Sequence, residues 1–499
     1  MFTKPGFAGI TRVIRLWATV ALLLLGFSKS GNAACALTTI YPDTIHQVAN
    51  ITRCSGPLDQ NNPNGTRYLI DVPSNWNSTL ILWSHPYAPP RATLYPATIV
   101  YNPAVHSYLL SNGYAAASSS FAGGWSVQDA LTDQLKVLDV FPQLGFGAPT
   151  RTIAWGGSLG GLITAGLAQE HPERFDGAAA ACAPLAGSVG LWNTALDMAF
   201  AFKTLLAPES NLQVVGLRNV PLALQFNLPI ALQYLDAAQG TPRGRARIAL
   251  VAALGDIPGW FGSLAPEPDA TDYSAQEASQ YLWFRRLDFG FLFAFRADLE
   301  QRAGDKNPSW NTGVNYAKQL EMSVNFEEVK ALYEQAGLDL GADLQTLEAA
   351  PRVAADDTAV DYLRENVSFT GDIQIPILTV FGTGDGLVAV ENGQAYKHVV
   401  AKAHETPLLR QLFVRRAGND AFHCTLTPAE QITALQLLIH RLDEGHWRGV
   451  GSDDLNAAAS SLDPGLNALP ESGSAKVPPA FVDFDPAPFL RPFIFDDEP

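Results

Sequence analysis

The sequence predicts an α/β fold in which a mostly parallel sheet carries helices on both faces and a large helical cap is inserted into it. Short apolar segments alternate with helical patterns from residue 68 to residue 186. The alternation stops over residues 187–372, which are helical in pattern, and resumes at Ile375. In addition, one apolar segment ends in a glycine-rich turn at Ser158, which is typical of a strand followed directly by a helix.

The first segment of the chain has the pattern of a secretory signal. Cations precede the apolar run Leu16–Phe27, and small residues follow it up to Ala34. The run is too short for a comfortable membrane span, although an uncleaved anchor remains the alternative. We therefore expect residues 1–34 to be removed, leaving a secreted protein, extracellular or periplasmic, that does not contact a membrane.

Composition and cysteine usage agree with this expectation. Apolar residues make up 47% of the 499 positions, and the formal charge is −16 with no stripe of Lys and Arg, which argues against a nucleic-acid partner. Four cysteines in an exported chain favour two disulfides, for which three pairings are possible. Cys35 and Cys54 are near in sequence and close a loop at the mature N-terminus, which leaves Cys182 and Cys424 as a long-range pair.

The elements of the sheet domain follow one another in order. Its first part, residues 35–186, has strand patterns at 68–72, 79–84, 113–121, 153–155 and 175–184 and helical patterns at 105–111, 127–140 and up to residue 167. Its second part, residues 373–450, has strands at 375–381 and 409–414 and helices at 394–402 and 428–442. Short strands that alternate with helices favour a parallel sheet.

Two further segments complete the predicted organisation. Residues 187–372 form the helical cap, since such a length cannot be a plain loop. Most of the aromatic side chains of the cap should pack in its core, and a minority should line an apolar substrate cleft. The aromatic residues considered are Trp192, Phe200, Phe202, Trp260, Phe261, Trp283, Phe284, Phe289, Phe291 and Phe293. Residues 451–499 form a Pro/Phe-rich C-terminal extension, which we expect to lie extended against the catalytic domain because its phenylalanines are costly to leave in water.

Ser158 is the predicted nucleophile. It stands in Gly156-Gly157-Ser158-Leu159-Gly160, between an apolar strand and a helical pattern. Glycine is required at this turn because a Cβ would collide with the neighbouring helix or strand. The turn lifts the hydroxyl above the sheet edge and directs the Leu159 N–H toward the same space, which provides half of an oxyanion hole at a helix N-terminus.

A serine nucleophile needs a base and a carboxylate, and the position of the loops selects both. Of nine histidines, His423 lies in a glycine-bearing loop after the last strand, at the sheet edge that carries Ser158. Asp385 follows the strand at 377–381 in Gly382-Thr-Gly-Asp-Gly, which gives the chain order Ser, Asp, His. Asp420, Glu391 and Asp372 remain as rival acids, and Asp420 is near enough in sequence to bond His423 locally.

The second oxyanion donor should come from the loop after the strand at 79–84. Pro86 in this loop has no N–H, so the Tyr87 amide is the candidate. His85 is expected to order the loop rather than to transfer protons. We predict no metal and no cofactor, because the sequence contains no His-Glu-x-x-His motif and no cysteine pair at ligand spacing.

These motifs resemble those of the alpha/beta-hydrolase superfamily over roughly residues 65–186 and 373–447. The nucleophile turn at Ser158, the acid turn at Asp385 and the histidine loop match the pattern, and the resemblance implies an eight-stranded, mostly parallel sheet and an acyl-serine intermediate. The elbow looks most like the secreted esterase and prolyl-oligopeptidase-like branches, without a propeller domain. His423-Cys424 also resembles the pair in tannase and feruloyl-esterase-like enzymes, where a disulfide ties the histidine loop to the nucleophile region. Here Gly157 precedes the serine, so Cys182 is the substitute partner of Cys424.

The leading hypothesis is a secreted serine hydrolase that cleaves carboxylic esters, either of a small molecule or of a polymer. The aromatic cap suggests an apolar or aromatic substrate group. A peptidase or amidase is the rival within enzymes, because the same triad supports both reactions. A non-catalytic binding protein on the same fold is the rival from a different class. The sequence makes no prediction of the oligomeric state.

Overall fold

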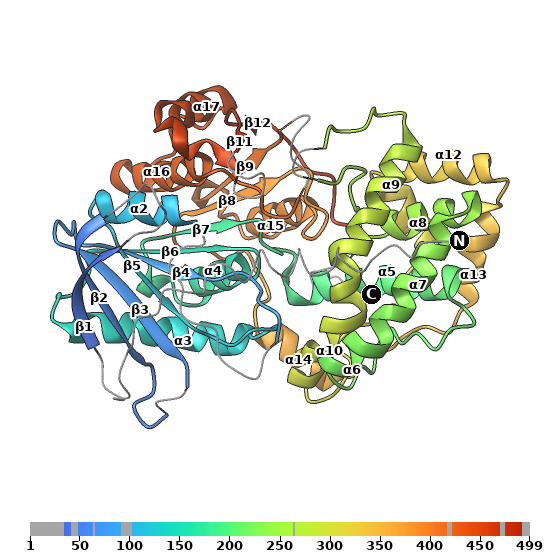
Figure 1. Cartoon of the computed structure of the whole chain (residues 1–499), viewed down its shortest axis with the longest axis horizontal. Coiled ribbons are helices and arrows are strands. Elements are labelled where there is room, and N and C mark those ends of the chain that lie inside the picture. The colour runs from blue at the N-terminus through green and yellow to red at the C-terminus, as the bar shows by residue number, and fades with distance from the viewer. Residues whose placement is uncertain are drawn as a thin grey trace, which may run out of the picture.

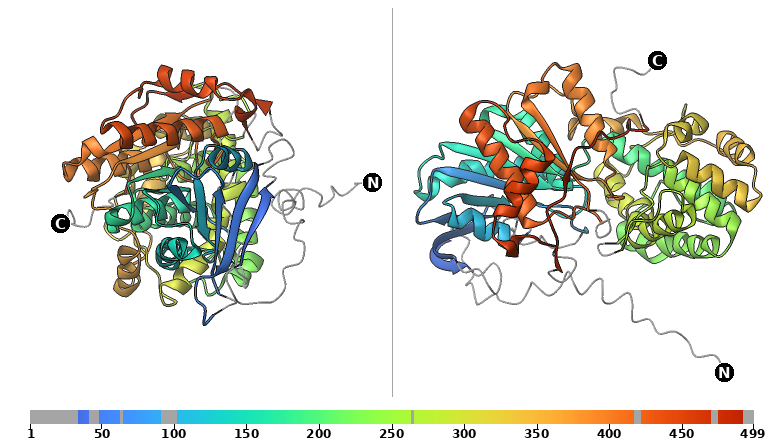
Figure 2. Two further views of the ribbon diagram at one scale, coloured as in Figure 1. Left: turned by 90° about the vertical axis from the view of Figure 1, so that its left-hand side faces the viewer. Right: turned by 90° about the horizontal axis from the view of Figure 1, so that it is seen from above.

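The computed structural model describes residues 34–40, 48–62, 65–90, 102–262, 265–416, 422–469 and 475–491. The predicted signal segment therefore lies outside the described residues, apart from residue 34, at which the first strand begins. Figure 1 shows a sheet domain on one side and a helical cap beside it, and the two further views in Figure 2 show the same two-part arrangement.

The sheet is mixed and has the strand order β1-β2-β3-β5-β4-β6-β7-β8-β9-β12. Its strands are β1 (Ala34–Ile40), β2 (Val48–Pro57), β3 (Arg67–Pro73), β4 (Thr79–Ser84), β5 (Ala115–Ser119), β6 (Arg151–Gly157), β7 (Gly177–Ala181), β8 (Ile377–Gly382), β9 (Leu409–Val414) and β12 (Phe481–Val482). The six strands β4, β5, β6, β7, β8 and β9 are parallel to one another, whereas β1, β2, β3 and β12 pair antiparallel with their neighbours. A separate two-stranded sheet is formed by β10 (Ala468–Leu469) and β11 (Ala475–Lys476).

The α/β class with a mostly parallel sheet is confirmed, but the main sheet has ten strands where the resemblance implied eight. The two-residue strand β12 comes from the C-terminal extension, whose proline-rich sequence has no strand pattern of its own. The central strands are short, with β4 and β5 fully buried and β7 buried except for its last residue. Because β5 and β7 consist of Ala, Ser and Gly, helices can approach the sheet closely on both faces.

Helices cover both faces of the sheet (Figure 1). One face packs against α2 (Pro103–Ser111), α16 (Pro428–Glu444) and α17 (Ser452–Ser461), and the other against α3 (Val127–Val140), α4 (Leu159–Glu170) and α15 (Glu391–Lys402). Short 3₁₀ turns are η1 (Phe141–Leu144), η2 (Pro172–Arg174), η6 (Thr406–Leu408) and η7 (Pro464–Leu466). In the part of the chain that the structure describes, no helix combines the length and apolar character needed to cross a membrane.

The cap lies in sequence between β7 and β8 and is built from helices. They are α5 (Gly187–Leu206), α6 (Val220–Leu222), α7 (Leu228–Gln239), α8 (Pro242–Ala253), α9 (Tyr273–Trp283), α10 (Arg296–Arg302), α11 (Tyr316–Met322), α12 (Phe326–Ala336), α13 (Leu340–Ala349) and α14 (Asp357–Glu365). Three π-helical segments interrupt them: η3 (Ala223–Asn227), η4 (Phe284–Asp288) and η5 (Phe291–Phe295). The buried helix α8 packs against α5, α7, α9 and α12, so it forms the centre of the cap.

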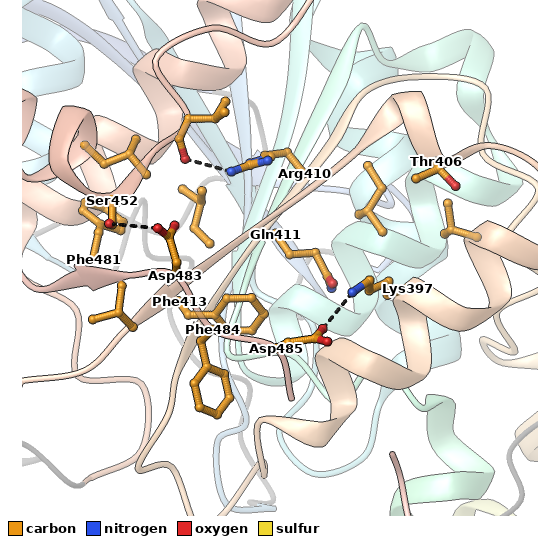
Figure 3. A pocket seen from close by; sticks show the side chains of 16 residues that line it. Lys397, Thr406, Arg410, Gln411, Phe413, Ser452, Phe481, Asp483, Phe484 and Asp485 are labelled. Atoms are coloured by element: carbon orange, nitrogen blue, oxygen red, sulfur yellow. Dashed lines mark hydrogen bonds and ion pairs between the residues drawn. The ribbon is translucent and has the colours of Figure 1, made fainter. Parts of the chain in front are cut away.

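The C-terminal extension runs along the edge of the sheet domain and then reaches the cap. Strand β12 pairs with β9, and the Phe484 ring packs against Phe413, with 5.6 Å between ring centroids. Figure 3 shows this region, where Asp485 forms an ion pair with Lys397 of α15 at 2.7 Å. The extension therefore lies against the catalytic domain, as the sequence predicts for its aromatic residues, and Phe493 and Phe495 lie outside the described residues.

A buried ion pair joins the end of the described extension to the cap. Arg491 Nε forms an ion pair with Asp197 Oδ2 of α5 at 3.0 Å, and the Arg491 guanidinium donates a hydrogen bond to the Trp310 carbonyl at 2.7 Å. Both side chains are buried. Burial raises the pKa of Asp197 to about 6, against the opposing effect of the Arg491 charge. The extension thus connects the sheet domain to the cap through a charge pair that is shielded from solvent.

Candidate active site

Ser158 occupies a sharp turn between β6 and α4. Its backbone lies at φ 56° and ψ −127°, a conformation that non-glycine residues rarely adopt. A Cβ on Gly156 would overlap the Gly160 carbonyl, and a Cβ on Gly160 would overlap the Ser84 carbonyl. Gly156 and Gly160 are therefore required by the close approach of β6, α4 and β4, whereas a Cβ on Gly157 would meet only ordinary contacts. The local structure is the turn that the sequence motif predicts.

The structure brings Ser158, His423 and Asp385 together in a line of hydrogen bonds. The Ser158 Oγ lies 2.8 Å from His423 Nε2, and His423 Nδ1 lies 2.8 Å from Asp385 Oδ2 and 3.0 Å from Oδ1. These distances are within the range at which a base can take a proton from a hydroxyl. The three side chains come from the carboxyl ends of β6, β8 and β9, which meet at one edge of the sheet.

Asp385 is buried and held by several donors. Its Oδ1 accepts hydrogen bonds from the Leu387 and Val388 N–H groups at 3.1 Å, and its Oδ2 accepts one from the Cys424 N–H at 3.1 Å. These bonds fix the carboxylate in one orientation against the imidazole. A buried carboxylate in this position sets the histidine tautomer and stabilises the imidazolium form.

Both predicted disulfides are present. Cys35 pairs with Cys54 across β1 and β2, at the sheet edge far from Ser158 in the strand order. Cys182, directly after β7, pairs with Cys424, with 5.4 Å between their Cα atoms. Because Cys424 follows His423, this bond ties the histidine loop to the strand next to β6.

The two candidate oxyanion donors border the same cavity as the nucleophile. Leu159 begins α4, and Tyr87 lies in the loop after β4; both line the cavity that contains Ser158. His85 stacks on Phe121 at 3.6 Å between ring centroids, and its ring nitrogens lie 2.7 Å from the Pro86 carbonyl and 3.2 Å from the Phe121 carbonyl. Burial lowers the pKa of His85, so this neutral ring orders the loop, in line with its expected role.

The cavity beside Ser158 has a volume of about 90 Å³ and a mostly apolar lining of aliphatic and aromatic side chains that includes Trp125, Leu191, Trp192, Met198, Phe291 and Phe489. It is of the same order as an apolar cavity that holds one benzene molecule, at about 150 Å³. Trp192 and Phe291 are the two residues from the predicted set of cap aromatics that line it, and Phe489 comes from the C-terminal extension. The cavity therefore suits a single aromatic ring.

The cap segment α9–η4–η5 lies over the site. Trp283 stacks on Phe422, the residue before His423, with 6.0 Å between ring centroids. Phe291 contacts the Tyr87 ring at 4.9 Å, on the loop of the second oxyanion candidate. One continuous stretch of the cap thus touches both the histidine loop and the oxyanion loop.

The rival acids are placed differently. Asp372 is exposed, and Glu391 is buried at the start of α15, where burial and the nearby Asp256 raise its pKa. Asp420 lies outside the described residues. Among the residues that the structure describes, no group of three or more His, Cys, Asp or Glu side chains is arranged to hold a metal ion.

Asp288 also borders the cavity, although it is not among the residues that the sequence predicts for the site. It ends the π-helical segment η4 and is almost fully buried, at 3% exposure. The signal that could have found it is a single acid followed by Phe-Gly-Phe-Leu-Phe in an otherwise apolar stretch of the cap. A charged residue type within such a stretch is rarely buried without a specific partner.

Comparison with known proteins identifies the family. The chain is 31% identical over 450 residues to an o-phthalyl amidase from Xanthobacter agilis, covering 85% of this chain and 95% of that protein. The chain belongs to the family of this amidase, within the alpha/beta-hydrolase superfamily. Residues 125–189 of this hydrolase, which include the nucleophile turn, also match the prolyl oligopeptidase family.

Solved structures similar to this alpha/beta-hydrolase include feruloyl esterase B from Aspergillus oryzae, at 14% identity and a TM-score of 0.42, covering 85% of this chain and 89% of that one. Candida antarctica lipase A in its closed state matches at 13% identity and a TM-score of 0.39, covering 90% and 94% of the two chains. The amidase relative and the match at residues 125–189, rather than these structures, identify the protein as a serine hydrolase of the alpha/beta-hydrolase type.

Proposed function

We propose that this protein is a secreted hydrolase that removes an aromatic acyl group from an amide, and from the corresponding esters, through an acyl-serine intermediate. The main support for this proposal is the continuous series of hydrogen bonds from Ser158 through His423 to Asp385. Ser158 borders a cavity of a size that suits one aromatic ring. The relative named as an o-phthalyl amidase favours an amide of an aromatic acid over the ester that sequence alone put first.

The proposed reaction proceeds in two halves. Ser158 Oγ attacks the acyl carbon while His423 Nε2 takes the hydroxyl proton, and the oxygen of the tetrahedral intermediate accepts hydrogen bonds from the Leu159 and Tyr87 N–H groups. The bond to the leaving group then breaks, and His423 gives its proton to the departing amine or alcohol. Water, activated by the same imidazole, releases the aromatic acid from Ser158. Asp385 stays ionised throughout and orients the histidine.

Secretion is part of this proposal. It is supported by the signal pattern of the first 34 residues together with two disulfides, which persist in oxidising compartments. Mass spectrometry of the protein recovered outside the cytoplasm should find a mature N-terminus near residue 35. A chain that retains its first residues would contradict this part.

The test combines covalent labelling with a substrate pair. A fluorophosphonate probe should modify the wild-type protein at Ser158 and leave the Ser158→Ala variant unmodified. The wild type should hydrolyse benzoyl 4-nitroanilide and benzoyl 4-nitrophenyl ester, and Ser158→Ala should hydrolyse neither. A wild-type protein that takes up no probe and cleaves neither compound would favour a non-catalytic binding role on the same fold.

A further inference from the structure

The loop that carries the predicted oxyanion donor Tyr87 is tied to a second loop of the sheet domain. This second loop, the β5–α3 loop, comprises residues 120–126. The Gly124 N–H donates a hydrogen bond at 2.7 Å to the carbonyl of Ala88, the residue after Tyr87. The backbone on one side of the oxyanion candidate is therefore fixed by the β5–α3 loop.

A second tie between the two loops lies on the other side of Tyr87. His85 stacks on Phe121, and one of its ring nitrogens lies 3.2 Å from the Phe121 carbonyl. The other ring nitrogen lies 2.7 Å from the Pro86 carbonyl. This carbonyl and the Tyr87 N–H belong to one planar peptide group, so a contact at the carbonyl also constrains the direction of the N–H. The position of the β5–α3 loop thus affects where the Tyr87 N–H points.

The β5–α3 loop is in turn held by the cap. Asp298 lies in the first turn of α10, and its buried carboxylate accepts a hydrogen bond on Oδ2 from the Trp125 N–H at 2.7 Å. The fit is close at Gly124, which has a φ of +84°, because a Cβ there would overlap the Asp298 carboxylate. Glycine at this position therefore allows a side chain of the cap to reach the backbone of the loop.

Arg302, one turn further along α10, strengthens this attachment. Its Nε donates to Asp298 Oδ2 at 3.1 Å, and its Nη2 donates to the Gly123 carbonyl at 3.0 Å. It also forms an ion pair with Asp129 of α3 at 3.3 Å. The guanidinium thus orients the Asp298 carboxylate and binds the loop that this carboxylate binds. Hydrogen bonds with a charged donor or acceptor are about twice as strong as those between neutral groups, so the attachment is firm.

Asp298 is close to the reaction site but does not border the cavity. Trp125, whose backbone it binds, packs edge-on against Trp192 with 5.4 Å between ring centroids, and both rings line the cavity that contains Ser158. Asp298 is not among the described residues that line this cavity. It can therefore influence the reaction only through the residues that it holds in place.

We propose that Asp298 is a positioning residue through which the cap sets the geometry of the oxyanion hole. Its carboxylate fixes the β5–α3 loop, and this loop fixes the backbone on both sides of Tyr87. The inference rests on the proposed function, because it takes the Tyr87 N–H as a donor to the tetrahedral intermediate. Loss of the Asp298 contact then displaces this donor while the triad of Ser158, His423 and Asp385 stays in place.

The test compares 4-nitrophenyl benzoate with its thiono analogue, in which sulfur replaces the carbonyl oxygen. Sulfur is a weak hydrogen-bond acceptor, so the oxyanion donors favour hydrolysis of the oxygen compound. Asp298→Ala should lower the ratio of kcat/KM for the oxygen compound to that for the sulfur compound about 10- to 100-fold, mainly through kcat. Both compounds have the same ring and leaving group. Effects on the Trp125 wall, on the triad and on the fraction of folded protein therefore cancel in the ratio.

Asp343→Ala is the matched control for a purely structural role. Asp343 is also a buried carboxylate, and it pairs with Arg247 at 2.7 and 2.8 Å within the cap. This variant should keep the wild-type ratio. Asp298→Asn should stay near it, because an amide oxygen can still accept from the Trp125 N–H. Arg302→Ala should lower the ratio less than Asp298→Ala and replaces that variant if it does not fold. An unchanged ratio in the variant used, or an equal fall in Asp343→Ala, overturns the proposal.

Hydrogen–deuterium exchange tests the same coupling without turnover. In Asp298→Ala, the amides of residues 121–126 and of residues 85–88 should both exchange faster than in the wild type, and in Asp343→Ala neither segment should change. This readout applies even if neither benzoate is hydrolysed and the proposed function fails. Faster exchange that is confined to residues 121–126 would mean that the cap holds the β5–α3 loop but not the oxyanion loop, which contradicts the proposal.

Discussion

Removal of the Cys182–Cys424 disulfide should damage catalysis and stability together, whereas removal of the other disulfide should affect stability alone. The two bonds close 242 and 19 residues of chain. From the entropy of loop closure in the unfolded chain, they contribute about 5 and about 3 kcal/mol respectively to the free energy of unfolding. The Cys182→Ala/Cys424→Ala variant should therefore have the lower thermal midpoint of the two double variants.

The catalytic effect follows from geometry. Asp385 accepts a hydrogen bond from the Cys424 N–H, and His423 is the preceding residue, so release of Cys424 loosens two members of the triad at once. A misplacement of reacting groups by about 1 Å can cost on the order of 100-fold in rate. We expect a loss of this size in kcat for the Cys182→Ala/Cys424→Ala variant, with KM changed little.

The assay is hydrolysis of an activated aryl ester at a temperature well below both midpoints, so that unfolding does not contribute. Cys35→Ala/Cys54→Ala is the matched control, since Cys54 lies on β2 and this bond is remote from Ser158. Its kcat should equal that of the wild type. If the variant that lacks Cys182 and Cys424 folds and retains full kcat, the disulfide does not position the histidine loop and the reasoning is refuted.

Three further predictions concern buried charged side chains. Asp385→Asn should keep the fold and lower kcat by about 10⁴, because the amide favours the wrong histidine tautomer; steady-state kinetics and a crystal structure of the variant check this. Arg491→Ala should lower the free energy of unfolding by about 3–5 kcal/mol in urea, since it leaves the buried Asp197 without its ion-pair partner, and adding Asp197→Asn should recover part of the loss. Burial raises the pKa of Asp256 to about 7, and burial together with the nearby Asp256 raises the pKa of Glu391 to about 8. The folded state therefore holds both protons more tightly than the unfolded state, and its stability falls as pH rises from about 4.5 toward neutral. Glu391→Gln should reduce this fall in thermal midpoints measured across that range. An unchanged slope for Glu391→Gln would contradict the assignment of the pair.

The sequence predicts the parts of the site that depend on local turns. Ser158, Asp385 and His423 each follow a short apolar strand in a glycine-bearing loop, and parallel strands bring such loops to one edge whatever lies between them. This is why three residues far apart in the chain could be selected without a structure. Their catalytic roles remain predictions until the labelling and kinetic tests are done.

Other features depend on long-range packing and were not predicted. The helical period does not identify Asp288 as a wall of the cavity, because the π-helical turns η4 and η5 shift which side chains face inward. Strand β12 is two residues long and forms only because β9 offers an edge. The ion pair of Arg491 with Asp197 joins two segments that are far apart in the chain, and the sequence of neither segment predicts that they are in contact.

The placement of the C-terminal extension has a consequence for biosynthesis. Strand β12, the cavity residue Phe489 and the cap anchor Arg491 all follow the predicted catalytic residues in the chain, so they leave the ribosome after them. During synthesis, Ser158, Asp385 and His423 are therefore all made before Phe489 can line the cavity beside Ser158. A polypeptide that stops before Phe489 lacks this part of the cavity wall and the ion pair that anchors the extension to the cap.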